Sequence, residues 1–73
     1  RHGKLARVEA ALFLSDEPMP ARKIARVAGL HDASEAHQIV EQLKTLLDTG
    51  GSAFTVVEIA GGYQLLTRKE YHN

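Results

Sequence analysis

The 73-residue sequence contains no cysteine, so it offers no disulfide framework, no thiolate ligand for zinc and no thiol nucleophile. No apolar run approaches the roughly 18 residues that a membrane-spanning helix needs. No charged segment followed by an apolar one resembles a signal peptide. These absences favour one small cytoplasmic domain. Because the chain begins at Arg1 and not at methionine, we expect it to be a fragment of a longer protein.

The chain also lacks net charge, because nine basic residues balance nine acidic ones. The two kinds are unevenly distributed: residues 1–31 carry six basic and three acidic side chains, whereas residues 32–58 carry one and five. The middle of the chain is therefore acidic, which disfavours contact with phosphates there.

The strongest periodic signal lies in residues 32–48, where apolar residues recur at the spacing of one helical stripe. Asp32 and Glu35 have the spacing of a capping box, and Gly50 and Gly51 provide the end of the helix. We therefore predict a long amphipathic helix. Its apolar stripe comprises Ala33, Ala36, Ile39, Val40, Leu43, Leu46 and Leu47.

Two shorter helices are expected before it, over residues 4–15 and 21–28. The second begins after Pro20 and ends at Gly29, as the preferences of proline and glycine at helix ends predict. Its apolar residues Ile24, Val27 and Ala28 should point inward. A short glycine-containing turn then leads into the long helix, which is the layout of a helix-turn-helix motif.

After residue 51 the periodicity changes to that of strands, over residues 52–59 and 63–67. With Gly61 and Gly62 as a two-residue turn, Val57 should pair with Leu66. Apolar residues occur on both faces of this hairpin, so either face could be buried. The extended segment around Met19 allows a short edge strand.

Three helices followed by a hairpin give an α+β fold, the winged helix-turn-helix, with the hairpin as the wing. We expect residues 1–67 to form this domain. Thr67 and Glu70 repeat the capping-box spacing, so residues 68–73 should begin a linker or a further helix toward a missing second domain.

The sequence offers little support for an enzyme. No serine has a spacing to histidine and acid that indicates a triad, and the paired glycines match no phosphate-binding fingerprint. The four histidines form no metal-ligand pattern, which favours solvated or capping roles. We therefore expect no catalytic residue, no metal and no cofactor. The histidines are His2, His31, His37 and His72.

Two binding functions remain open. A winged-helix transcriptional regulator would bind DNA, with Arg22, Lys23 and Arg26 as weak phosphate contacts. The long helix opposes this function because it carries Glu35, Glu41 and Asp48, and the wing tip has no basic side chain. A protein-contact module needs no basic surface.

The first helix is apolar on nearly every side, which is typical of a helix buried between other elements. The alternative is that Ala10, Phe13 and Leu14 face a partner chain. Small residues there would permit close approach of another backbone. These three residues are the candidate protein interface.

Two strings resemble the segregation and condensation protein B family: VEAALFLSDEP over residues 8–18 and VEIAGGYQLLT over residues 57–67. The resemblance covers nearly the whole chain, and the second string is the more distinctive. Pro20 departs from the family pattern where a serine or threonine cap is expected, and Lys69 where proline is frequent. Both departures concern helix boundaries.

The resemblance implies the N-terminal winged-helix domain of a non-enzymatic subunit with two such domains. Proteins of this family dimerise and bind a kleisin subunit, segregation and condensation protein A. With it they regulate a bacterial chromosome-organising ATPase of the SMC type. The implied location is cytoplasmic, at the nucleoid through that complex, and neither a membrane nor sequence-specific DNA binding is implied.

Overall fold

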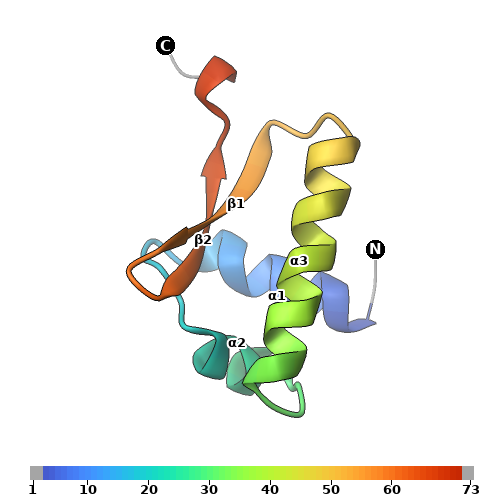
Figure 1. Ribbon diagram of the computed structural model, residues 1–73, viewed down its shortest axis with the longest axis vertical. Helices are drawn as coiled ribbons and strands as arrows, with labels where there is room; N and C mark the ends of the chain where they lie inside the picture. Colours follow the sequence, from blue (N-terminus) through green and yellow to red (C-terminus); the bar gives the residue numbers. More distant parts are fainter. Residues whose placement is uncertain (1–2, 72–73) are drawn as a thin grey trace.

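In the computed structural model, residues 3–71 form three helices, a two-stranded antiparallel hairpin and a terminal 3₁₀ turn (Figure 1). The predicted winged helix is confirmed, and each predicted helix end lies within one residue of the observed end. The hairpin stands beside the long helix, and the two shorter helices lie behind and below it. The elements are α1 (Gly3–Leu14), α2 (Ala21–Ala28), α3 (Ala33–Thr49), β1 (Phe54–Ile59), β2 (Gly62–Thr67) and η1 (Lys69–Tyr71).

Helix α3 begins with the predicted cap. The Asp32 carboxylate accepts a hydrogen bond from the Glu35 backbone N–H at 2.9 Å. The Glu35 carboxylate does not complete the usual box at Asp32; it accepts from the His31 backbone N–H at 2.7 Å, one residue earlier. At the other end, the Gly50 N–H donates to the Leu46 carbonyl at 3.0 Å. Both ends therefore have partners for backbone groups that a helix leaves unpaired.

The stripe of α3 forms the centre of the core, as predicted. Leu43 and Val40 have no exposed surface, and α1 and α2 pack against this side of the helix. Leu46 is the exception, because 43% of its surface is exposed. It lies at the edge of the stripe, 100° around the helix from Leu47, which is buried in its place.

Helix α2 buries Ile24 and Ala28 as predicted, but the inward placement of Val27 is wrong. Val27 is 54% exposed, and Ala25 is buried instead. The reason is geometric: Ile24, Ala25 and Ala28 share one face, while Val27 follows Lys23 by one turn on the other. The small alanines also let α2 lie close to α3.

The hairpin has a different register from the predicted one. The turn is Ala60 and Gly61, with φ of 50° and 80°, and Ile59 pairs with Gly62. A two-residue turn of this kind needs positive φ at both central positions. Partners therefore shift by two residues, so that Val57 pairs with Gln64 and not with Leu66.

A shift by two residues leaves each side chain on its predicted face, because side chains alternate along a strand. The buried face is now defined by Val56 and Tyr63, with Leu65 partly buried beside them. The opposite face carries Ile59 and Leu66, both more than one-third exposed.

The predicted edge strand is a single antiparallel bridge. Met19 and Tyr63 exchange two backbone hydrogen bonds, of 2.8 and 2.9 Å. Gly62 lies directly under this crossing, since a Cβ there would stand 2.9 Å from the Met19 nitrogen and 3.0 Å from the Pro18 carbonyl carbon. Gly62 thus allows the close approach of a third strand, whereas Gly61 serves the turn.

Replacing Gly62 with alanine should therefore cost about 1–3 kcal/mol, because the added methyl group must displace backbone and not a flexible side chain. Gly61→Ala is the matched control: its Cβ meets open space, and only the positive φ opposes it. Urea unfolding measures the loss of unfolding free energy in both variants. Hydrogen exchange at the Met19 amide then shows which variant disturbs the bridge to Tyr63. Faster exchange in Gly61→Ala than in Gly62→Ala would contradict this role.

Past the hairpin, the predicted helix start appears as the 3₁₀ turn η1, with Glu70 in its first turn. The division at residue 67 into a winged-helix domain and a following linker or helix stays a prediction.

Candidate functional site

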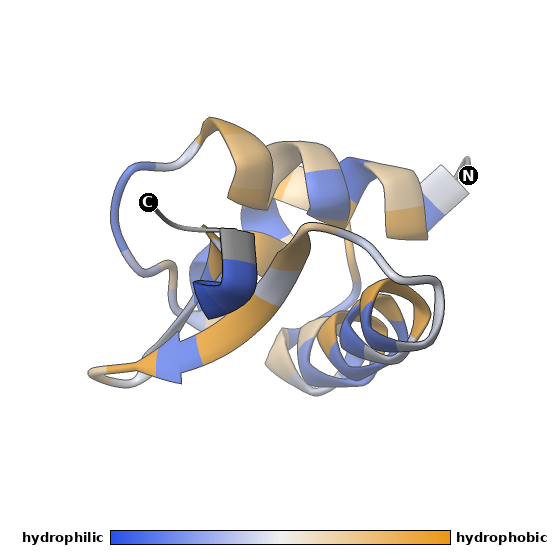
Figure 2. Cartoon of the chain, turned by 90° about the horizontal axis from the view of Figure 1, so that it is seen from above, coloured by the Kyte–Doolittle hydropathy of each residue, from blue (hydrophilic) through white to orange (hydrophobic). Residues whose placement is uncertain are grey.

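The candidate interface on α1 is exposed. Phe13 is 64% and Leu14 83% exposed, and Ala10 lies on the same outer side. Val8 and Leu12 are buried, so α1 contributes one face to the core and leaves the other uncovered. One face of this helix is therefore buried, as the first alternative expects. The other face is exposed and available to a partner, as the second alternative requires. We call Ala10, Phe13 and Leu14 the α1 face; in Figure 2, α1 runs along one edge of the fold and is coloured hydrophobic over much of its length.

A groove of about 340 Å³ adjoins the α1 face, between α1, the end of α3 and the hairpin. Phe13 stands at its edge and contacts Phe54 edge-to-face, with ring centroids 6.2 Å apart. Phe54 is itself 37% exposed, so the aromatic pair is only partly covered. The sequence did not identify Phe54, because it reads as an ordinary strand residue. The groove is lined by Ala6, Glu9, Ala10, Phe13, Leu47, Ser52, Phe54 and Leu65.

Several charges of α3 are neutralised by other elements of the fold. Lys4 of α1 pairs with Glu35 at 2.6 Å, and Arg68 pairs with Asp48 at 2.7 Å. The His31 N–H and the Lys4 ammonium lower the pKa of Glu35. Arg68, and then the hydroxyl of Thr55, lower the pKa of Asp48. Lys4 and Arg68 are therefore already paired within the chain.

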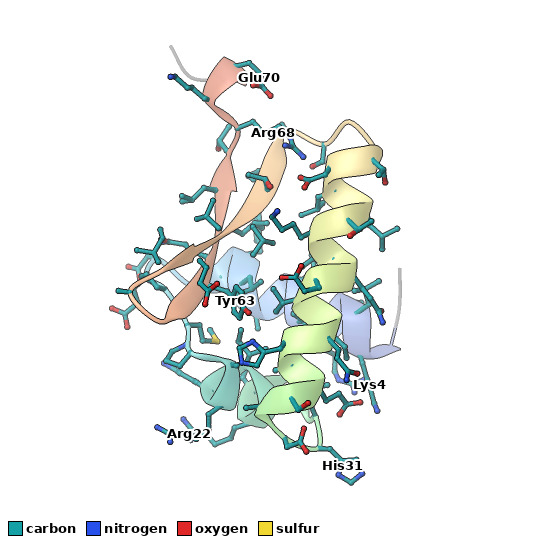
Figure 3. The ribbon with its side chains drawn as sticks, in the orientation of Figure 1. Lys4, Arg22, His31, Tyr63, Arg68 and Glu70 are labelled. Carbon is teal, nitrogen blue, oxygen red and sulfur yellow. The ribbon has the colours of Figure 1, made fainter. Side chains whose placement is uncertain are left out.

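Arg68 joins the end of β2 to the end of α3 (Figure 3). Its Nε donates to the Ser52 carbonyl at 2.7 Å, and its Nη2 donates to the Leu47 carbonyl at 3.1 Å as well as to Asp48. Sequence reasoning missed this residue, because the partners lie between 16 and 21 positions away. It fixes the direction in which the chain leaves the hairpin.

Arg68→Gln should cost about 1–2 kcal/mol near neutral pH through the two lost bonds to part-buried carbonyls. It should also flatten the acid limb of the stability curve. A carboxyl group whose pKa is lower in the folded than in the unfolded state stabilises the fold at pH above its unfolded pKa. That stabilisation is lost as the pH falls through the folded pKa. The contribution of Asp48 is thus lost below about pH 3.8.

Urea unfolding between about pH 6 and pH 3 measures this flattening, with Lys23→Gln as the control on an exposed cation. Parallel curves for Arg68→Gln and the unchanged chain would show that Arg68 does not set the titration of Asp48.

The groove between α3 and the hairpin is acidic at the place where a winged helix would meet DNA. Glu41 and Glu58 line it beside Tyr63, with Lys44 as the one cation of the lining. Burial raises the pKa of the Tyr63 phenol, and the two carboxylates raise it further. The phenol shares a 2.6 Å hydrogen bond with His37 Nδ1. His37 is exposed as expected, but this bond was not predicted, because α3 and β2 are distant in sequence.

The alternative phosphate contacts Arg22, Lys23 and Arg26 are brought together on the outer side of α2. Neither α3 nor the wing tip extends them into a basic surface, since the groove between α3 and the hairpin carries Glu41 and Glu58 against the single cation Lys44. The structure thus assembles three cations without the surface that duplex binding requires.

Within residues 3–71, no group of three or more histidine, cysteine or acidic residues could hold a metal ion. His2 and His72 lie outside the described residues. In the same part of the chain, no helix is long and apolar enough to cross a membrane.

Comparison with known proteins identifies the family. The sequence model described as "Segregation and condensation complex subunit ScpB" matches residues 6–73. The chain belongs to this family. A relative, segregation and condensation protein B of Symbiobacterium thermophilum, is 38% identical to the chain over 69 residues. The alignment covers 94% of this chain and 31% of that protein, so the chain spans about a third of its relative's length.

Solved structures agree with the ScpB assignment. A crystal structure described as a dimer of the ScpB N-terminal domain complexed with ScpA peptide is 32% identical, with a TM-score of 0.82, over 92% of this chain and 83% of that one. A conserved hypothetical protein from Chlorobium tepidum is 30% identical, with a TM-score of 0.78, over 93% and 43%. ScpB from Mycobacterium tuberculosis shares the fold, with a TM-score of 0.83 over 93% and 42% at 18% identity.

Proposed function

We propose that this chain is the N-terminal winged-helix domain of a non-enzymatic accessory subunit in a bacterial SMC–kleisin complex for chromosome segregation and condensation. In this role it forms a homodimer and binds the kleisin, segregation and condensation protein A, through which it acts on the SMC ATPase. The observation that carries the proposal is its likeness to the ScpB N-terminal domain, whose dimer holds an ScpA peptide. That likeness covers 92% of this chain.

The α1 face is proposed as the contact between two copies. Phe13 and Leu14 are the most exposed large apolar side chains of the described residues. Exposed apolar surface of this kind is typical of a protein-protein contact. The adjoining groove and the small Ala10 allow a second chain to approach α1 closely. Aromatic residues such as Phe13 also dominate the energetics of contacts that exclude water.

The electrostatics support protein contact over DNA binding. A DNA-binding winged helix presents cations on the second helix of its motif. Here Lys44 of that helix pairs with Asp48, which also pairs with Arg68. Glu41 and Glu58 line the adjoining groove. The proposed place of action is the cytoplasm, at the nucleoid through the complex.

Fluorescence anisotropy tests the proposal, with a labelled peptide from the kleisin and a labelled 20-base-pair duplex titrated in parallel. We expect saturable binding of the peptide that changes little between about 50 and 200 mM salt, and duplex binding that is far weaker. Duplex affinity that exceeds peptide affinity and falls steeply with salt would instead support the DNA-binding regulator.

A further inference from the structure

Helix α2 presents a second exposed surface, separate from the α1 face. Arg22 and Arg26 lie one turn apart, and Lys23 and Val27 lie one turn apart beside them. All four side chains are exposed, and Arg22 points away from the fold in Figure 3. We call these four residues the α2 patch.

The cations of the patch differ from most others in residues 3–71. Lys4, Lys44 and Arg68 each contact a carboxylate, and Arg7 donates to the Ala28 carbonyl at 2.7 Å. No ion pair between the described residues involves the three cations of the patch, and α2 contains no acidic residue. Their charge is therefore available to an external anion.

Val27 gives the patch a second property. It is 54% exposed and lies at the edge of the patch, one turn after Lys23 and next to Arg26. A phosphate backbone or a lipid headgroup supplies anions but leaves such an apolar side chain in contact with water. A protein segment can cover it with an apolar side chain while its carboxylates meet the cations.

The neighbouring surface also disfavours an extended polyanion. The groove between α3 and the hairpin carries Glu41 and Glu58 against a single cation, Lys44, so a duplex or membrane reaching past the patch meets net negative charge there. A short segment, by contrast, need cover only the length of α2, which has eight residues.

We propose that the α2 patch docks an acidic segment of another protein, with carboxylates about one helical turn apart and an apolar residue beside them that covers Val27. This inference needs neither the homodimer nor the kleisin contact, since α2 lies outside the α1 face. It assigns the three cations to protein recognition.

Nuclear magnetic resonance titration of the full chain tests this proposal. The probe is a blocked twelve-residue peptide of glutamate, leucine and alanine, with glutamates four apart and one leucine per turn. Its control replaces every glutamate with glutamine. A 16-base-pair duplex and vesicles containing phosphatidylglycerol are titrated separately.

We expect the acidic peptide, and not its glutamine control, to shift the amides of residues 21–28. Arg22→Gln with Arg26→Gln should weaken it about tenfold. Val27→Ser should weaken the peptide several-fold but leave any duplex binding unchanged. Lys69→Gln, a cation outside the patch, should have no effect.

Three results would overturn the docking proposal. The first is that millimolar acidic peptide shifts no amide resonance. The second is that the peptide shifts amides outside residues 21–28 and none within them. The third is tighter binding of the duplex or the vesicles than of the peptide at the same residues. None of these depends on whether the kleisin peptide binds or whether Phe13 supports a dimer, so the two proposals fail separately.

Discussion

Replacing Phe13 with glutamate is expected to raise the dissociation constant of the proposed homodimer about a thousandfold. Truncating an aromatic residue central to an interface costs about 2 kcal/mol or more. In a two-fold dimer each substitution acts twice, and about 4 kcal/mol corresponds to roughly three decades in affinity. Burying a glutamate against the same apolar surface adds to the loss. Sedimentation velocity over a concentration series measures the change.

The fold should survive this substitution, because Phe13 is 64% exposed and lies outside the buried core. Leu66→Glu is the matched control: Leu66 is 38% exposed on the outer face of the hairpin and away from α1. If the Leu66 variant dissociates and the Phe13 variant remains dimeric, the interface lies on the hairpin and the α1 face is wrongly assigned.

Leu43→Ala should have the largest effect on stability, lowering the free energy of unfolding by about 3 kcal/mol. Leu43 is fully buried on α3, in the core cluster that joins the helices to Val56 and Tyr63 of the hairpin. A domain of this size buries only a modest share of its surface, so such a loss is a large part of its total stability.

Leu46→Ala provides the comparison on the same helix. Leu46 is 43% exposed, so its removal should cost less than about 1 kcal/mol. Urea unfolding of both variants measures the difference between their unfolding free energies, and the dependence of that free energy on urea concentration should be unchanged. Equal costs at the two positions would contradict the placement of the core on the Leu43 side of α3.

The helices could be predicted because their signals are local. The stripe of α3, the Asp32 cap and the glycine after α2 each depend on residues within one or two turns. Helix α2 shows the limit of this approach. It has few apolar residues, so periodicity did not distinguish Val27 from Ala25, and the structure buries Ala25 on the face of Ile24 and Ala28.

The hairpin register could not be predicted, because two glycines in succession allowed two turns. The structure uses Gly61 in the turn and Gly62 beneath Met19, a contact between segments more than 40 residues apart in sequence. Arg68 and the His37–Tyr63 bond escaped prediction for the same reason. Their partners are brought together only by the fold.

The candidate site was partly accessible from sequence. Helix α1 has more apolar residues than its one core-facing side requires, and this surplus indicated Phe13 and Leu14. The groove and the contribution of Phe54 could not be predicted, since they depend on how the hairpin packs against α1. Acidic residues on α3 were visible in the sequence, but their partners Lys4 and Arg68 were not.

Cysteine cross-linking tests the protein-contact function most directly, because the chain contains no cysteine of its own. Single variants Ala10→Cys and Leu14→Cys place a thiol on the α1 face, and Thr45→Cys places one on the exposed side of α3. With a short bismaleimide, the α1 variants should yield covalent dimers at micromolar concentration and the Thr45 variant should not. Efficient cross-linking through Thr45, with none through Ala10 or Leu14, would contradict the proposed dimer.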